Sequence, residues 1–156
     1  MKTKQLQACW WDYLSTSERL LRSLHEQTAA VVLRDVERVE RLQPEIERLL
    51  TLLQAIDDKA VTSAKELAGE LGVDPNFRSL VNALSSEEQR SVHALANRVK
   101  AAAQSVQAVI QKNQALIENE LAFVSGSLHV MARAAENHEG QFGQKTHAAV
   151  LVDERA

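Results

Sequence analysis

The sequence contains few residues that interrupt helices and few that favour β-strands. Its 156 residues include five glycines and two prolines, and aromatic residues make up 4% of the chain. Glycine and proline break helices, and aromatic side chains are enriched in strands. Alanine, leucine, glutamine, glutamate and arginine, which favour helices, are abundant instead. The composition therefore predicts an all-α protein, and the length suits one domain.

The chain also lacks features that several classes of protein require. Cys9 is the single cysteine, which excludes an internal disulfide and a zinc site built from thiolates. We expect Cys9 to be buried as a small hydrophobic side chain. The net charge is -3, and Lys and Arg are spread along the chain, so we expect no nucleic-acid partner. There is no signal-peptide pattern and no run of about 20 apolar residues, which predicts a cytosolic protein that does not insert into membranes.

No cluster of residues indicates catalysis or a bound cofactor. No glutamate stands three residues before a histidine, so the carboxylate-bridged di-iron pattern is absent. The zinc-protease, phosphate-loop and nucleophile-elbow motifs are absent too. His25 lies within a predicted helix, as the histidine of a phosphotransfer domain does, but Gln27 and Thr28 follow where such a domain has a small residue and a lysine. We therefore expect a protein that is not an enzyme and holds neither a metal nor a cofactor.

Two long helices are predicted in the first third of the chain. Apolar residues at steps of three and four indicate one helix from about Gln5 to Val32 and another from about Arg34 to Ile56. We expect them to form a tight antiparallel hairpin, because a single helix of that combined length would leave its apolar stripe uncovered. Pro44 should kink the second helix or start a new one near Gln43, because proline removes a helical hydrogen bond.

The following segment, residues 57–84, has a less regular pattern. Thr62 or Ser63 with Glu66 after it resembles a capping box, which marks the start of a helix. Gly72 suits the C-terminus of that helix. We interpret the segment as short helices that close one end of a bundle.

The last helix is predicted to be long, from Ser85 or Ser86 to about Glu136. Serine followed by acidic residues is a helix start signal. The helix should either break near residues 125–127 or project beyond the other helices. Its apolar stripe alternates steps of three and four, as in a coiled-coil seam, and consists of Val92, Leu95, Val99, Ala103, Val106, Ile110, Asn113, Ile117, Leu121, Val124, Leu128 and Met131.

The expected fold is an elongated antiparallel helical bundle or coiled coil with a long C-terminal helix. It should comprise residues 1–137 as one domain. Residues 138–156 contain glycines and little helical patterning, so we expect them to form a flexible tail.

Asn113 is a polar residue in the middle of the apolar stripe. One interpretation is that its amide fixes the register of the bundle, at a cost in stability. The other is that it makes a polar contact with a partner helix.

The stretch "QKNQALIENELAFVSGSLHVM", followed by "GQFGQ", resembles the FlgN family of flagellar export chaperones. That family has a helix with an asparagine, apolar residues three and four positions on, further apolar residues every three or four, and an aromatic-glycine pair in a short tail. The matching residues are Asn113, Leu116, Ile117, Leu121, Val124, Leu128, Phe142 and Gly143. The similarity is specific in this stretch, and elsewhere only the pattern agrees.

The resemblance implies a cytosolic chaperone of the type III flagellar export system. Its clients would be the hook-filament junction proteins, whose terminal helices, the C-terminal ones above all, it would hold and deliver to the export gate. The C-terminal half of the long helix would supply the client-binding groove. Phe142 would contribute to docking on the gate. It stands where the family usually has tyrosine, so a hydrogen bond from that hydroxyl is absent here.

Two other interpretations fit the same features. The apolar seam could pair with a second copy, which would make the protein a self-associating coiled-coil scaffold. Alternatively, His25 would carry a phosphoryl group in a signalling bundle of the histidine phosphotransfer type.

Overall fold

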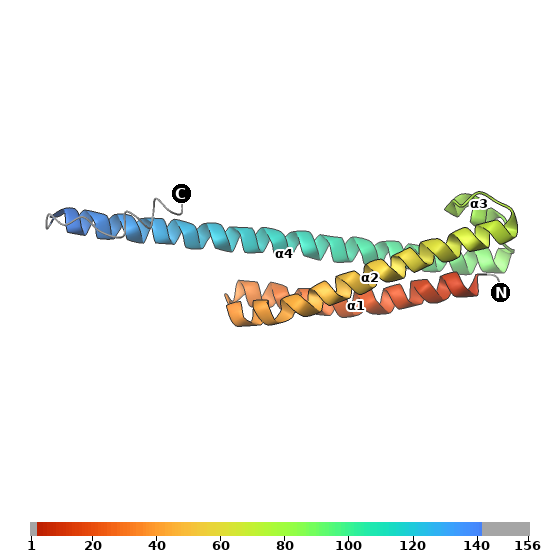
Figure 1. Ribbon diagram of the computed structural model, residues 1–156, viewed down its shortest axis with the longest axis horizontal. Helices are drawn as coiled ribbons and strands as arrows, with labels where there is room; N and C mark the ends of the chain where they lie inside the picture. The colour runs from red at the N-terminus through yellow and green to blue at the C-terminus, as the bar shows by residue number, and fades with distance from the viewer. Residues whose placement is uncertain (1–2, 142–156) are drawn as a thin grey trace. The chain divides into compact units, whose positions relative to one another are not determined.

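The computed structural model describes residues 3–141, with side chains to residue 137, and this part of the chain is helical without any strand (Figure 1). This confirms the expected all-α class. The helices, in chain order, are α1 (Lys4–Val32), α2 (Val36–Leu71), α3 (Phe77–Asn82) and α4 (Ser86–Gln141).

A very short turn joins α1 and α2 into the predicted antiparallel hairpin. Arg34 has a left-handed backbone conformation with φ 56°. Its N–H donates to the carbonyl of Val31 at 3.0 Å, and the N–H of Asp35 donates to the carbonyl of Ala30 at 2.9 Å. These two bonds form a Schellman motif, which satisfies the last carbonyls of α1. The Asp35 carboxylate then accepts from the N–H of Arg38 at 3.1 Å and caps the start of α2.

The second helix is longer than the sequence pattern indicated. It continues from the predicted end at Ile56 to Leu71, so the prediction of short helices from residue 57 was wrong over this stretch. Pro44 lies inside α2 and does not start a new helix. The predicted end at Gly72 is correct, because this residue has φ 65° and forms the C-cap. Glycine adopts that left-handed conformation without a steric penalty.

The capping signature at Thr62 and Ser63 does not act as a cap. The Thr62 hydroxyl donates to the carbonyl of Asp58 one turn earlier at 3.0 Å, as is common for threonine within a helix. Ser63 is buried, and its hydroxyl oxygen lies 3.9 Å from the Cys9 sulfur. The burial expected for Cys9 is confirmed.

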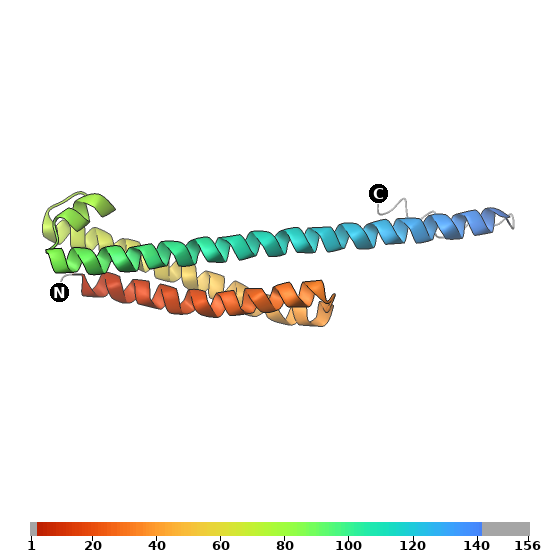
Figure 2. The same ribbon diagram turned by 180° about the vertical axis from the view of Figure 1, so that it is seen from behind.

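Three apolar clusters form the core that holds these helices together. One joins α1, α2 and α4 and consists of Leu20, Leu24, Ile46, Leu49, Leu53 and Val106. Another joins α1, α2 and α3 and consists of Leu6, Cys9, Ala60, Leu67, Ala68 and Leu80. The third joins α3 and α4 through Val81, Leu84 and Val92. Burial of each leucine contributes about 1.5–3 kcal/mol. The result is a bundle of α1, α2 and the first part of α4, with α3 at one end (Figures 1 and 2).

The start of α4 follows the predicted signal. The Ser85 hydroxyl accepts from the N–H of Glu88 at 3.4 Å and lies 3.2 Å from the carboxylate of the same residue, which is a capping arrangement. The helix continues through Gly126, so the break considered near residues 125–127 does not occur. It reaches Gln141, past the predicted end. The remainder of the predicted tail, residues 142–156, lies outside the described residues.

The chain divides into two compact units, and the boundary falls inside α4. The first unit ends at Asn113 and the second begins at Gln114. All three apolar clusters belong to the first unit.

Candidate partner-binding surface

Asn113 closes the first unit with a buried set of hydrogen bonds to α1. The side chain is 2% exposed. Its amide nitrogen donates to the carbonyl of Leu24 and to Oε1 of Gln27, both at 2.9 Å. Its carbonyl oxygen accepts from the Thr28 hydroxyl at 2.6 Å. That hydroxyl also lies 3.0 Å from the Leu24 carbonyl, and since it has a single proton, the shorter contact takes it.

The same network extends across the bundle to α2. Gln27 accepts from Asn113, and its own amide nitrogen lies 3.4 Å from Oε1 of Gln43. Gln43 in turn donates to the carboxylate of Glu47 at 3.1 Å. Each amide therefore donates to the next group, and the chain of bonds connects α4, α1 and α2. Because a shift of any one helix by a turn would separate these partners, the network favours a single register.

The structure therefore accounts for Asn113 within the bundle. Its amide nitrogen and its carbonyl oxygen both form hydrogen bonds with residues of α1. Of the two interpretations drawn from the sequence, the register interpretation needs no further partner. The surface that could bind a partner is formed by the residues that follow Asn113 on α4.

The other predicted site residues belong to the second unit and become more exposed along the helix. Leu116 and Ile117 are half-buried. Leu121 is 62% exposed, and Val124 and Leu128 are exposed as well. Phe142, the predicted docking residue, lies outside the described residues.

Four of these apolar residues, together with Met131, form one stripe along α4, which we call the main stripe. At about 100° per residue, they fall within an arc of about 80° on the helix. Val106, which packs in the core between α1 and α2, falls within the same arc by this spacing. The main stripe therefore continues the face that the first unit uses for its own packing, and it consists of Ile117, Leu121, Val124, Leu128 and Met131.

A second apolar stripe on the same helix was missed by the sequence interpretation. Leu116, Phe123 and Val130 recur at steps of seven, which returns to nearly the same side of a helix. Phe123 and Val130 are exposed, Val130 to 66%. The centre of this second stripe is about 120° from that of the main stripe. The seven-residue repeat of these three residues could have revealed the second stripe, but the sequence interpretation followed the alternating steps of three and four in the main stripe.

A surface with this many exposed apolar side chains is suited to binding a partner. Large exposed apolar patches on soluble proteins mark interaction sites. No group of His, Cys, Asp and Glu within the described residues is arranged to hold a metal ion. None of the helices in that part of the chain is long and apolar enough to cross a membrane. The arrangement offers apolar contact, and an amphipathic helix is the partner that such a face fits.

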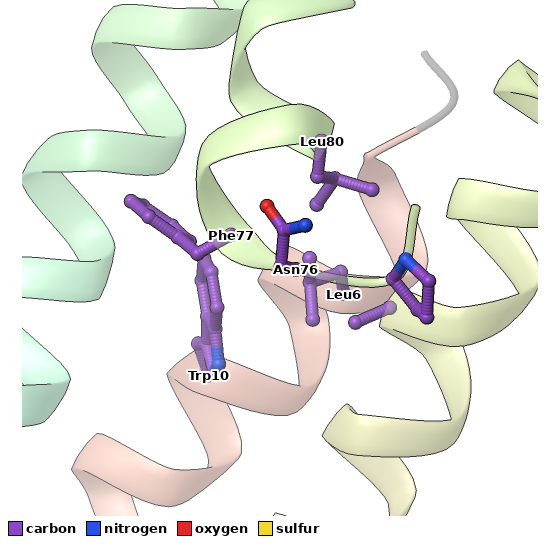
Figure 3. Close-up of a pocket in the computed structure, with 7 residues that line it drawn as sticks. Leu6, Trp10, Asn76, Phe77 and Leu80 are labelled. Carbon is purple, nitrogen blue, oxygen red and sulfur yellow. The ribbon is translucent and has the colours of Figure 1, made fainter. Parts of the chain in front are cut away.

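The first unit also has a small apolar pocket, where the loop before α3 meets α1 and α2. Figure 3 shows Trp10 and Phe77 among the side chains that line this pocket. Its volume is about 100 Å³, and it is lined by Leu6, Trp10, Ala64, Pro75, Asn76, Phe77 and Leu80. The Asn76 side chain caps α3 by accepting from the N–H of Ser79 at 2.8 Å. The pocket has room for one apolar side chain and presents no ionisable group.

The three aromatic residues near the start of α1 have different surroundings. Trp10 packs against two of the apolar clusters. Trp11 is exposed, and the guanidinium carbon of Arg98 lies 4.7 Å from the centre of its ring. Tyr13 packs against the cluster that contains Val106. These residues tie α1 to α4 and do not form a ligand site.

A family model described as FlgN protein matches residues 1–145 of the chain. No curated protein and no solved structure matches it.

Proposed function

The chain belongs to the FlgN family of flagellar export chaperones, and from this we propose which proteins it serves and how. Its clients are the hook-filament junction proteins. In the cytosol it holds their terminal helices, the C-terminal ones above all, and delivers them to the flagellar export gate.

The exposure of the main stripe is the observation that carries this proposal. Leu121, Val124 and Leu128 have no core to pack into within the described residues, although their spacing is that of a packed seam. A client segment that is disordered alone would bury its own apolar stripe against them as it folds into a helix. Asn113 then marks the end of the bundle's packing, and the residues from Leu116 onward serve the client.

The energetics favour a complex that holds the client and still releases it. Each Å² of apolar surface removed from water contributes about 25 cal/mol. Ordering a disordered segment costs about 2–5 kcal/mol or more, which offsets part of that gain. A moderate affinity follows, which suits a protein that must give up its client during export.

Replacement of both Leu121 and Leu128 by Asp tests the client surface. Both side chains are exposed, so the helical circular dichroism and the free energy of unfolding should change little. The loss of two apolar contacts of about 1.5–3 kcal/mol each should weaken client binding by at least about 100-fold. Isothermal titration with a purified hook-filament junction protein measures this.

The matched control is Ala122→Asp with His129→Asp. Both residues are exposed and belong to neither stripe, so this variant should bind the client like the unmodified protein. Wild-type affinity of the Leu121→Asp/Leu128→Asp variant would refute the proposed surface. Its global unfolding would identify the two leucines as core residues.

Delivery to the gate is tested separately at Phe142. The family resemblance assigns docking to this position, so Phe142→Ala should leave client affinity unchanged and reduce secretion of the client from cells. Loss of client binding in this variant would contradict the division of roles.

The same apolar surface also favours self-association as a second candidate. In that case the main stripe would pair with a second copy of the chain. Sedimentation of the protein without client distinguishes the two functions, because a stable dimer that the client does not dissociate supports the scaffold.

A further inference from the structure

Gly126 and the two serines beside it form a stretch of low helix propensity within the second unit of α4. Glycine is costly inside a helix, and serine favours caps and turns over helix interiors. A Cβ added at Gly126 would have no atom within 4 Å, so packing of the straight helix does not require glycine here. The straight form of α4 therefore does not account for this stretch, residues 125–127.

The turn between α1 and α2 shows which backbone such a stretch suits. Its three residues, 33–35, end one helix, take a left-handed conformation at Arg34 and cap the next helix with Asp35. In residues 125–127 glycine stands in the place of Arg34, and glycine adopts the left-handed conformation without a steric penalty. Serine stands in the place of Asp35, and serine is among the preferred N-cap residues. Residues 125–127 therefore suit this turn at least as well as the residues that form it.

The apolar spacing around Gly126 also matches the spacing around Arg34. Two buried residues of α1 stand three and ten positions before Arg34, and they are Val31 and Leu24. The first apolar residues of α2 that are not exposed stand five and eight positions after it, and they are Val39 and Leu42. The same four positions counted from Gly126 carry Phe123, Leu116, Met131 and Ala134. A turn of the same kind at Gly126 would therefore place the second stripe, through Phe123 and Leu116, opposite Met131.

We propose that the chain without client also adopts a bent form, in which α4 turns at residues 125–127 and the helix after the turn packs on the second stripe. Phe123, Val130 and Met131 are 55–66% exposed in the straight helix, and burying them against each other favours the bent form. The turn also moves Leu128 and Met131 out of line with the first half of the main stripe. The bent form is therefore autoinhibitory, and a client helix that binds the whole main stripe selects the straight form. The role of the client in this inference rests on the proposed function.

Spin labels on both sides of the turn measure the bend in the full-length chain. Gln114→Cys and Glu136→Cys place them at exposed positions of the second unit that belong to neither stripe, and Cys9→Ala removes the native thiol. In the straight helix the labelled residues lie about 33 Å apart, at 1.5 Å per residue. In the bent form the two helix axes would lie about 8–10 Å apart, so the labels should approach to within about 20 Å. Double electron–electron resonance gives both distances and their populations.

We expect the short distance in at least about half of the client-free molecules, and addition of a full-length hook-filament junction protein should shift the population to the long distance. Alanine at all three of residues 125–127 should remove the short distance. It should also tighten client binding at least about twofold, because the bent fraction reduces the apparent affinity. Phe123→Asp on the second stripe should remove the short distance as well, whereas the matched Leu121→Asp on the main stripe should keep it.

The outcomes separate this inference from the proposed function. A single long distance in the client-free chain overturns the inference and leaves the chaperone function in place. A short distance that the alanine variant retains would come from unravelling of the helix end, and one that disappears on dilution with unlabelled chain would come from a second copy; either result overturns the inference. Client binding that leaves both populations unchanged overturns the autoinhibitory role. If the client fails to bind the alanine variant while the unmodified turn shows both distances, the proposed function fails and the bent form stands.

Discussion

Asn113 is buried in the first unit and links α4 to α1 through its side-chain hydrogen bonds. Its three hydrogen bonds reach residues that lie far away in sequence, at Leu24, Gln27 and Thr28 of α1. An unpaired amide at a buried site costs free energy, whereas a fully paired one contributes modestly. The Asn113 amide therefore destabilises an incorrect packing of the helices more than it stabilises the correct packing.

Replacement of Asn113 by Ala should lower the free energy of unfolding by about 1–3 kcal/mol. The substitution leaves the Gln27 side-chain carbonyl without its buried donor and creates a small cavity. Urea denaturation followed by circular dichroism measures the change. Gln114→Ala is the control, because Gln114 is exposed and its loss should alter stability by less than about 0.5 kcal/mol. Equal effects of the two substitutions would show that the network is not important for stability.

The polar character of position 113 was evident from the sequence, but its partners were not. A polar residue within a seam indicates either a register contact or a binding contact. Choosing between them requires the position of Gln27 relative to Asn113, and residue spacing carries no information on contacts between distant helices.

At the level of elements, the apolar periodicity of the sequence predicted where the helices lie, whereas capping and packing interactions determine where each helix begins and ends. The bounds of α1 agree with its apolar periodicity, α4 begins at its predicted serine signal but runs past its predicted end, and Gly72 ends α2 as predicted. The error in α2 came from Thr62 and Ser63, whose type suits a cap but which lie inside a continuous helix. Burial of Ser63 against Cys9 gives that stretch a packing role, and tertiary packing outweighs the capping preference.

Two glycines at the C-terminal end of α2, Gly69 within the helix and Gly72 at its C-cap, should change stability in opposite directions when replaced by alanine. Gly72→Ala places a side chain in the left-handed conformation at φ 65°, which should lower the free energy of unfolding by about 1–2 kcal/mol. Gly69 is helical and exposed, and a Cβ added there would have no atom within 4 Å. Gly69→Ala should therefore raise the free energy of unfolding by about 0.5–1 kcal/mol. Chemical denaturation of both variants measures the pair. Destabilisation by Gly69→Ala would contradict the assignment of helix to this position.

At the level of the whole molecule, packing and binding are divided between two units. The first unit contains the apolar clusters, and the second carries the part of α4 in which the apolar residues from Leu121 to Met131 are exposed. The sequence predicted the main stripe, because alternating steps of three and four are unambiguous. The periodicity alone did not predict which part of that stripe is covered, since burial depends on where α1 and α2 end. The expectation that the C-terminal half of the helix binds the client came from the family resemblance.

Amide hydrogen exchange should distinguish the two units and locate the client. A helix with few buried apolar contacts opens at low free-energy cost, so amides of residues 117–137 should exchange at least tenfold faster than those around Leu49. Addition of a hook-filament junction protein should slow exchange in residues 117–137 and leave the region of Leu49 unchanged. Mass spectrometry of peptic fragments resolves both regions. Protection confined to the first unit on client addition would place the binding surface on the bundle of α1 and α2 and refute the role of the exposed stripes.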